Sequence, residues 1–229
     1  MTSSRTLVLL GSLLLLGSGS MTEPERTASP PPSPRRATPP GPVLFADDFS
    51  DDRLVGWKPD RAGVWSVRRG VLRADLPDER QQRSFLYVGS ESWTHYAVDL
   101  DVVGMRGVDK GVVVRVVEGQ AGIGVDLRGP GYQDVLLYRR EWPLAKAPVL
   151  NGNGTWNHLR IEARGHRYRV WVNGVVVIDK QDSRKSRPNG CIALAAYTGG
   201  LGQCTVYYDN VVVTALGSGE GSATVESTP

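Results

Sequence analysis

The chain alternates hydrophobic and polar residues over most of its length, most clearly in the run WNHLRIEARGHRYRVWVNG. Leu159 and Ile161 alternate with polar neighbours, and the alternation resumes after Gly165. Period two is typical of a strand with one buried face. Asn173-Gly174 then suits a two-residue hairpin turn, because both residue types tolerate positive φ. The run therefore predicts consecutive antiparallel strands joined by tight turns.

Similar short runs, bounded by Gly, Pro, Asn and Asp, recur along the chain. Outside the run just described, strands are predicted at residues 43–49, 63–67, 71–74, 85–88, 96–103, 111–117, 122–127, 134–138, 191–197 and 205–215. No convincing helix of ten residues occurs within this core, and no repeat of propeller or solenoid type is present. Many short strands with glycine-rich turns indicate an all-β antiparallel sandwich.

The segments on either side of this core have a different composition. Residues 1–20 resemble a signal peptide, since Arg5 precedes an apolar run of the right length and small residues follow it. We therefore expect an extracellular or cell-surface protein with no transmembrane domain, an uncleaved N-terminal anchor being the alternative. Residues 21–42 are rich in Pro and Ser and predict a disordered linker, and residues 217–229 predict a disordered tail. The folded domain is then 43–216, and we expect it to be a monomer.

Charge and cysteine content narrow the function classes. The formal net charge of +3 is too small to indicate a nucleic-acid-binding protein. The two cysteines, Cys191 and Cys204, make a disulfide credible in an exported protein, although a simple hairpin between them would not place them opposite each other.

Polar side chains interrupt three of the middle strands. In GVVVRVV, Val112, Val114 and Val116 are predicted to share one face, with Arg115 on the other. If these strands are neighbours, one side of the sheet carries arginine, aspartate and tyrosine, the mixture that binds sugar hydroxyls and the apolar face of a sugar ring. The candidate ligand-binding residues are Arg115, Asp126, Arg128, Tyr138, Arg140 and Trp142. The alternative is a solvated sheet face with no ligand.

The segments FADDFSDD, IGVDLRGPGYQDVLLYR, GTWNHLRIEARGHRYRVWVNG and CTVYYDNVVV resemble the concanavalin-A-like jelly-roll domains of lectins and glucanases. Within that group the chain is most similar to the bacterial 3-keto-disaccharide hydrolase domain, which is family 16 glycoside hydrolase-like, and it also resembles laminin-G-like modules. The resemblance covers about residues 43–216. It implies a jelly-roll β-sandwich whose concave sheet binds the ligand, with Arg115 and Asp126 on ligand-facing strands.

Three functions remain open at this point. The first is an exported carbohydrate-binding domain, and the second is a hydrolase or lyase of 3-keto-disaccharides or related glycosides. The third is a laminin-G-like adhesion module that binds protein. The ordinary family 16 motif, Glu-x-Asp-x-Glu, is absent. A 3-keto group acidifies the hydrogen at C2, so an enzyme of the second kind needs a base, for which Asp126 is the candidate, with Arg115 or Arg128 to polarise the ketone.

A structural Ca²⁺ ion is the one cofactor that the sequence suggests. Asp47 and Asp48 end the first predicted strand, and Asp209 lies in the last. The terminal strands pair in the fold that the chain resembles, and carboxylate oxygens suit Ca²⁺. The alternative is that each aspartate caps a turn.

Overall fold

The computed structural model describes residues 41–118, 120–140, 142–184 and 187–217. The predicted signal peptide at 1–20 lies outside these residues, as do residues 21–40 of the predicted linker and 218–229 of the predicted tail. The described residues form β-strands and no helix. None of them therefore forms a helix that is long and apolar enough to cross a membrane.

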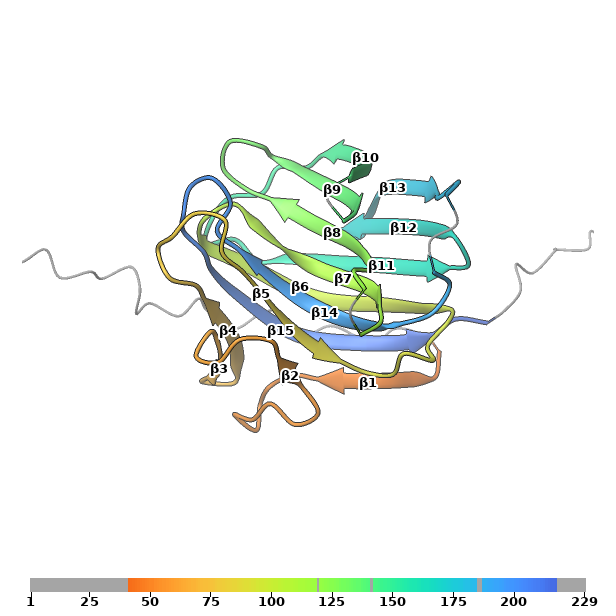
Figure 1. Ribbon diagram of the computed structural model, residues 1–229, viewed down its shortest axis with the longest axis horizontal. Coiled ribbons are helices and arrows are strands. Elements are labelled where there is room, and N and C mark those ends of the chain that lie inside the picture. Colours follow the sequence, from red (N-terminus) through yellow and green to blue (C-terminus); the bar gives the residue numbers. More distant parts are fainter. Residues whose placement is uncertain (1–40, 119, 141, 185–186, 218–229) are drawn as a thin grey trace, which may run out of the picture.

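The strands form two antiparallel sheets that stack face to face (Figure 1). One sheet has the order β13 (Val175–Gln181), β12 (Arg167–Val172), β11 (Asn157–Arg164), β6 (Tyr96–Arg106), β15 (Thr205–Ala215), β4 (Val71–Asp75) and β3 (Trp65–Arg68), with β1 (Val43–Asp47) added to β15. The other has the order β10 (Trp142–Pro148), β9 (Asp134–Arg139), β8 (Ile123–Arg128), β7 (Asp109–Val116), β14 (Cys191–Tyr197), β5 (Arg83–Val88) and β2 (Lys58–Pro59). This arrangement confirms the predicted all-β jelly-roll sandwich.

The hairpins predicted from the alternating run are present. Leu159 and Ile161 of β11 are fully buried in the core. Asn173 and Gly174 join β12 to β13 with φ values of 51° and 83°, the left-handed region that a two-residue turn of this type requires. This run therefore builds the scaffold of the eight-stranded sheet, as its pattern predicts.

Two buried tyrosines of the eight-stranded sheet hold the strands that carry the candidate site. The Tyr208 hydroxyl on β15 accepts a hydrogen bond from the Gly111 amide at 2.9 Å and donates to the Ala195 carbonyl at 2.6 Å. The Tyr96 hydroxyl on β6 accepts from the Arg115 amide at 2.8 Å. Each hydroxyl would be costly to bury without a partner, so these bonds fix β7 and β14 against the opposite sheet.

A β-bulge in β7 overturns the predicted face of Arg115. The pairing of β7 with β14 shifts between Val116 and Val113, and Arg115 adopts a φ of 62°. Val114 therefore lies in the core, whereas Val116 joins Val113 on the outer face. A bulge adds one residue to one strand, so it reverses the alternation that places Val112, Val114 and Val116 together.

The same bulge turns Arg115 into the protein. Its side chain is 2% exposed and donates to the carbonyls of Ala163 at 2.9 Å and Gly165 at 3.3 Å. It also bonds to the carbonyls of Thr94 and Pro188. The guanidinium therefore ties β7 to the ends of segments from both sheets, and the predicted placement of Arg115 on the same sheet face as Asp126 is wrong.

The credible disulfide is not formed. Cys191 and Cys204 are both buried free thiols. Cys191 packs on the outer face of the seven-stranded sheet, whereas Cys204 belongs to the core between the sheets. The two clusters lie on opposite sides of the seven-stranded sheet, so the two thiols are separated by it.

Candidate active site

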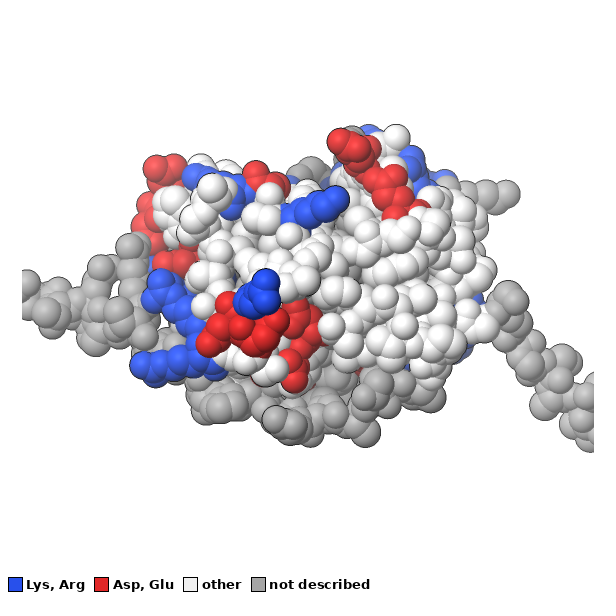
Figure 2. Space-filling model, turned by 90° about the horizontal axis from the view of Figure 1, so that it is seen from below, with Lys and Arg blue, Asp and Glu red and all other residues white. Residues whose placement is uncertain are grey.

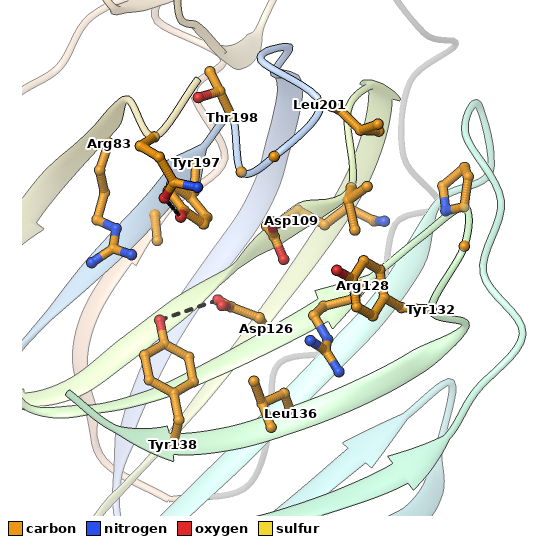
Figure 3. Close-up of a pocket in the computed structure, with 18 of the residues that line it drawn as sticks. Arg83, Asp109, Asp126, Arg128, Tyr132, Leu136, Tyr138, Tyr197, Thr198 and Leu201 are labelled. Atoms are coloured by element: carbon orange, nitrogen blue, oxygen red, sulfur yellow. Dashed lines mark hydrogen bonds between the residues drawn. The ribbon is translucent and has the colours of Figure 1, made fainter. Parts of the chain in front are cut away.

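A polar cavity lies on the outer face of the seven-stranded sheet, the face turned away from the sandwich core. Its volume is about 540 Å³, within the range of small-molecule sites. Strands β5, β7, β8, β9 and β14 contribute its floor, and the loops after β8 and β14 contribute its rim (Figure 3). The labelled lining residues are Arg83, Asp109, Asp126, Arg128, Tyr132, Leu136, Tyr138, Tyr197, Thr198 and Leu201.

Asp126 and Tyr138 form a hydrogen-bonded pair on the floor of this cavity (Figure 3). They lie on the neighbouring strands β8 and β9, and the Tyr138 hydroxyl donates to Asp126 Oδ1 at 3.3 Å. Burial, reinforced by the nearby carboxylate of Asp109, raises the pKa of Asp126 to about 7. Burial also raises the pKa of Tyr138, so its hydroxyl stays protonated and remains a donor.

Two arginines on the cavity wall have different neighbours. The Arg128 guanidinium binds Asp134 in a two-point contact, with Nε and Nη2 each 2.7 Å from a carboxylate oxygen, and it lies over the ring of Tyr132. Arg83 lies over the ring of Tyr197, with its Cζ 4.4 Å from the ring centre, and its guanidinium points into the cavity (Figure 3). Arg83 is therefore the better placed cation to meet a group bound beside Asp126.

Gly124 makes room for the tyrosine of the pair. A Cβ atom at this position would lie 2.2 Å from Tyr138 Cζ, far inside van der Waals contact. Gly124 pairs directly with Tyr138 across β8 and β9. The missing side chain therefore allows the phenol ring to lie flat over β8 and to reach Asp126.

We predict that Gly124→Ala displaces Tyr138 and breaks its hydrogen bond to Asp126. Any activity that depends on the pair should fall at least about tenfold, because small displacements of catalytic groups have large effects on rate. The matched control is Gly152→Ala, where an added Cβ meets nothing within 4 Å. Activity assays with thermal unfolding curves check the prediction, and equal activities for the two variants would contradict it.

The structure brings four of the six predicted ligand residues to the cavity and excludes two. Asp126, Arg128, Tyr138 and Arg140 line it. Arg115 is buried by the bulge, and Trp142 begins the edge strand β10 with 71% of its surface exposed, outside the cavity lining.

Sequence reasoning missed Arg83, Asp109 and Tyr197. All three lie at strand ends: Arg83 and Asp109 each lie two residues before a predicted strand, and Tyr197 is the last residue of one. Asp109 opens β7 two residues before the predicted start, and it shares the face of Asp126 because it pairs with Arg128 in the β7–β8 ladder. Extending the period-two alternation outward from each apolar run could have found Arg83 and Asp109.

The aspartates of the predicted calcium site have other partners. Asp47 Oδ1 accepts from the Phe49 amide and Oδ2 accepts from Trp57 Nε1, each at 2.7 Å. Asp48 accepts from the Ser50 amide at 3.1 Å. Across the described part of the chain, no group of three acidic, histidine or cysteine side chains could hold a metal ion. The geometry therefore supports the turn-capping interpretation of Asp47 and Asp48.

The distribution of charged side chains on the surface is consistent with the small net charge of the chain. The face seen from below carries acidic and basic side chains close to one another, together with a broad uncharged area (Figure 2). This face presents no continuous basic surface of the kind that follows a nucleic-acid backbone.

Solved structures with the same fold include a carbohydrate-binding module and a domain in a Man3GlcNAc-bound form. The carbohydrate-binding module CBM66 from Bacillus subtilis is 18% identical, with a TM-score of 0.59, over 70% of this chain and 96% of that one. The VIP36 exoplasmic/lumenal domain, in a Ca²⁺/Man3GlcNAc-bound form, is 13% identical, with a TM-score of 0.60, over 79% and 93% of the two chains. LamAcat from Zobellia galactanivorans is 12% identical, with a TM-score of 0.55, over 76% and 97%. At these identities the likeness establishes the fold alone.

No curated protein matches the sequence. A family model does match: residues 44–214 fit the 3-keto-alpha-glucoside-1,2-lyase-like domain. The match begins within β1 and ends within β15, so it includes every strand that lines the cavity. The chain therefore belongs to the family of 3-keto-alpha-glucoside-1,2-lyase-like domains.

Proposed function

We propose that the polar cavity binds a glucoside oxidised at C3 and that Asp126 removes the proton from C2. The observation that carries this proposal is the Asp126 carboxyl on the cavity floor, hydrogen-bonded to Tyr138, with a pKa of about 7. A base is most effective when its pKa lies close to the working pH, because it is then both unprotonated and able to hold a proton. The family description names the substrate type to which this chemistry applies.

The proposed reaction is an elimination across C1 and C2. The ketone at C3 makes the C2 hydrogen acidic, and Asp126 takes that proton. The electron pair of the C2–H bond passes through an enolate and becomes the C1=C2 double bond, while the C1–O bond breaks. The departing oxygen takes the proton back from the Asp126 carboxyl, so the base is regenerated and no oxidant or reductant is consumed.

Charge develops on the C3 oxygen during proton removal, and the cavity offers a cation to stabilise it. Arg83 lines the same cavity from β5 (Figure 3), and its positive charge lowers the pKa of the Asp126 carboxyl. Arg128 is held by Asp134 and is less able to turn toward the substrate. We therefore assign the electrophilic role to Arg83 in place of Arg115 or Arg128.

Carbohydrate binding without turnover is the second candidate. CBM66, a binding module, has the same fold at a TM-score of 0.59, and arginine with tyrosine side chains is a suitable set of groups for sugar hydroxyls and ring faces. The two functions differ in one requirement, because only the elimination needs a base.

Methyl 3-keto-α-glucoside tests the proposal, with methanol release as the readout. The wild-type chain should release methanol and consume the sugar in equal amounts. Binding of the sugar with no release would support the second candidate instead. If the sugar is neither bound nor cleaved, both functions are contradicted.

The raised pKa of Asp126 predicts a specific dependence of stability on pH. The folded state holds the Asp126 proton up to about pH 7, whereas the unfolded state releases it near the ordinary aspartate pKa of 3.8. Folding therefore favours proton binding between these values, and the contribution of Asp126 to stability falls as the pH rises from about 4 to about 7. We expect Asp126→Asn to unfold at a higher temperature than the wild type at pH 8, with the difference vanishing near pH 4.

Thermal unfolding of the two proteins across this pH range checks the linkage. Asp179→Asn is a useful contrast, because Arg167 and Arg169 hold the pKa of this exposed carboxyl down to about 2. That variant should gain no stability at pH 8. A constant difference between Asp126→Asn and the wild type at all pH values would show that the Asp126 pKa is not raised.

A further inference from the structure

A second hollow continues from the polar cavity along the same face of the seven-stranded sheet. Its volume is about 730 Å³. The two hollows share Arg83, Phe85, Tyr138 and Arg140, so a bound molecule can extend from one into the other without leaving the sheet. Tyr138 marks the boundary, since its hydroxyl is bonded to Asp126 on the polar side.

The floor of this second hollow is apolar, although it lies on an outward-facing sheet surface. Val113, Val116, Cys191 and Ala193 line it and belong to a hydrophobic cluster separate from the core of the sandwich, and each is 9% exposed or less. An apolar cluster on the outer side of a sheet is informative, because outward strand positions are usually polar.

Two aromatic rings flank this floor. Phe85 and Tyr87 are alternate residues of β5 and point to the same side, with ring centres 6.0 Å apart and planes inclined by 42°. Both pack against the apolar cluster and line the hollow while remaining partly exposed. The charged lining residues include Lys58, Arg83, Glu91, Glu118 and Arg140, and none of them belongs to the cluster that forms the floor.

We propose that this apolar hollow binds the group attached to C1 of the substrate, and that this group is aromatic. The inference rests on the proposed elimination, because that reaction places the leaving group directly beside the sugar ring. A group leaving C1 next to Asp126 can pass Tyr138 and enter the hollow. The preferred substrate is then an aryl 3-keto-glucoside, with its sugar in the polar cavity and its ring against Phe85 and Tyr87.

A second sugar would be a poor occupant of this hollow. The charged lining residues lie outside the floor, so the hydroxyls that face the valine and alanine side chains would lose water and gain no partner there, which costs binding free energy. A flat aromatic group instead replaces water on an apolar floor and meets two rings at the offset and tilted geometries that aromatic pairs prefer. Volume is sufficient, since hollows of 300–1,000 Å³ accommodate drug-sized ligands.

The test compares phenyl and methyl 3-keto-α-glucosides on the full chain, with affinities measured by calorimetry on the Asp126→Asn variant to prevent turnover. The phenyl glucoside should bind about ten- to hundredfold more tightly than the methyl glucoside, which is the gain expected from burying one aromatic ring. Phe85→Ala should remove most of that advantage. Because Phe85 also lines the polar cavity, Tyr87→Ala, at a residue that lines the second hollow alone, should reduce the advantage and leave the affinity for the methyl compound unchanged. Phe85→Tyr should retain the advantage, because it keeps the ring.

A second variant covers the case in which Phe85→Ala does not fold. Val113→Thr preserves side-chain shape and adds a hydroxyl to the apolar floor, so it should lower the affinity for the phenyl compound alone. Equal affinities for phenyl and methyl, or a phenyl advantage that survives both Phe85→Ala and Val113→Thr, would overturn the assignment of the hollow and leave the proposed elimination standing. Binding of neither compound would instead reject the proposed function, and the aromatic inference with it.

Discussion

Replacing Asp126 with asparagine is expected to lower kcat for methyl 3-keto-α-glucoside by about a hundredfold to ten-thousandfold, the usual contribution of a general base. The amide keeps the shape of the carboxyl and can still accept a hydrogen bond from the Tyr138 hydroxyl. In the wild type this hydroxyl lies 3.3 Å from Asp126 Oδ1. The amide cannot take the C2 proton. KM should change much less than kcat, because the amide preserves the contacts that hold the sugar.

The Asp179→Asn variant is the control for this substitution, since Asp179 lies on β13 of the opposite sheet and pairs with Arg167 and Arg169. It should have wild-type kcat. Circular dichroism should be the same for all three proteins. If Asp126→Asn retained more than about a tenth of wild-type kcat, Asp126 would not be the base, and the proposed role of this carboxyl would be wrong.

Replacing Arg115 with alanine should give the largest loss of stability among the residues considered, about 3 kcal/mol or more. The guanidinium is 2% exposed and serves carbonyls from separate segments, including Ala163 and Gly165. Its removal leaves these buried acceptors without a donor and opens a space beside Tyr96, over whose ring the guanidinium lies. Urea unfolding of the full chain measures the change.

Arg140→Ala is the matched control for this prediction. Both arginines occupy left-handed backbone positions, with φ values of 62° and 52°, so the backbone effect of the substitution is similar. Arg140 is exposed, and its loss should cost less than about 0.5 kcal/mol. Equal losses for the two variants would show that the buried hydrogen bonds of Arg115 contribute little.

The scaffold follows from the sequence wherever the period-two pattern is regular. Leu159 and Ile161 alternate without interruption, and Asn173-Gly174 supplies a turn that few other residue pairs can form. These local signals agree with the final packing, so the strands of this region were predicted together with their buried faces.

The alternating pattern predicts the wrong strand face for Arg115, because the alternation of apolar and polar residues does not reveal a β-bulge. Five valines surround this arginine in GVVVRVV, and no glycine, asparagine or proline marks the extra residue. The bulge is fixed by tertiary contacts: the Tyr96 hydroxyl holds the Arg115 amide, and distant carbonyls hold its guanidinium. Those partners lie 19 and 48 residues away in the chain, beyond the reach of any local pattern.

Only the part of the candidate site that lies on regularly alternating strands could be predicted from the sequence. Asp126, Arg128 and Tyr138 lie in strands whose alternation is regular, and their common face was predicted correctly. Arg83 reaches the cavity only because β14 places β5 two strands from β7, a strand order that the sequence does not specify. The apolar hollow is likewise assembled from β5, β7 and β14.

Proton NMR of the wild-type chain with methyl 3-keto-α-glucoside tests the central claim most directly, because it follows the C2 proton itself. The account predicts that the C2 signal disappears at the rate at which methanol appears, while the C1 proton moves from an anomeric to a vinylic position. Methanol release with the C2 proton retained would contradict elimination by Asp126 and indicate direct hydrolysis. An unchanged spectrum without saturation transfer to the sugar would contradict the sugar site altogether and favour a protein-binding sandwich.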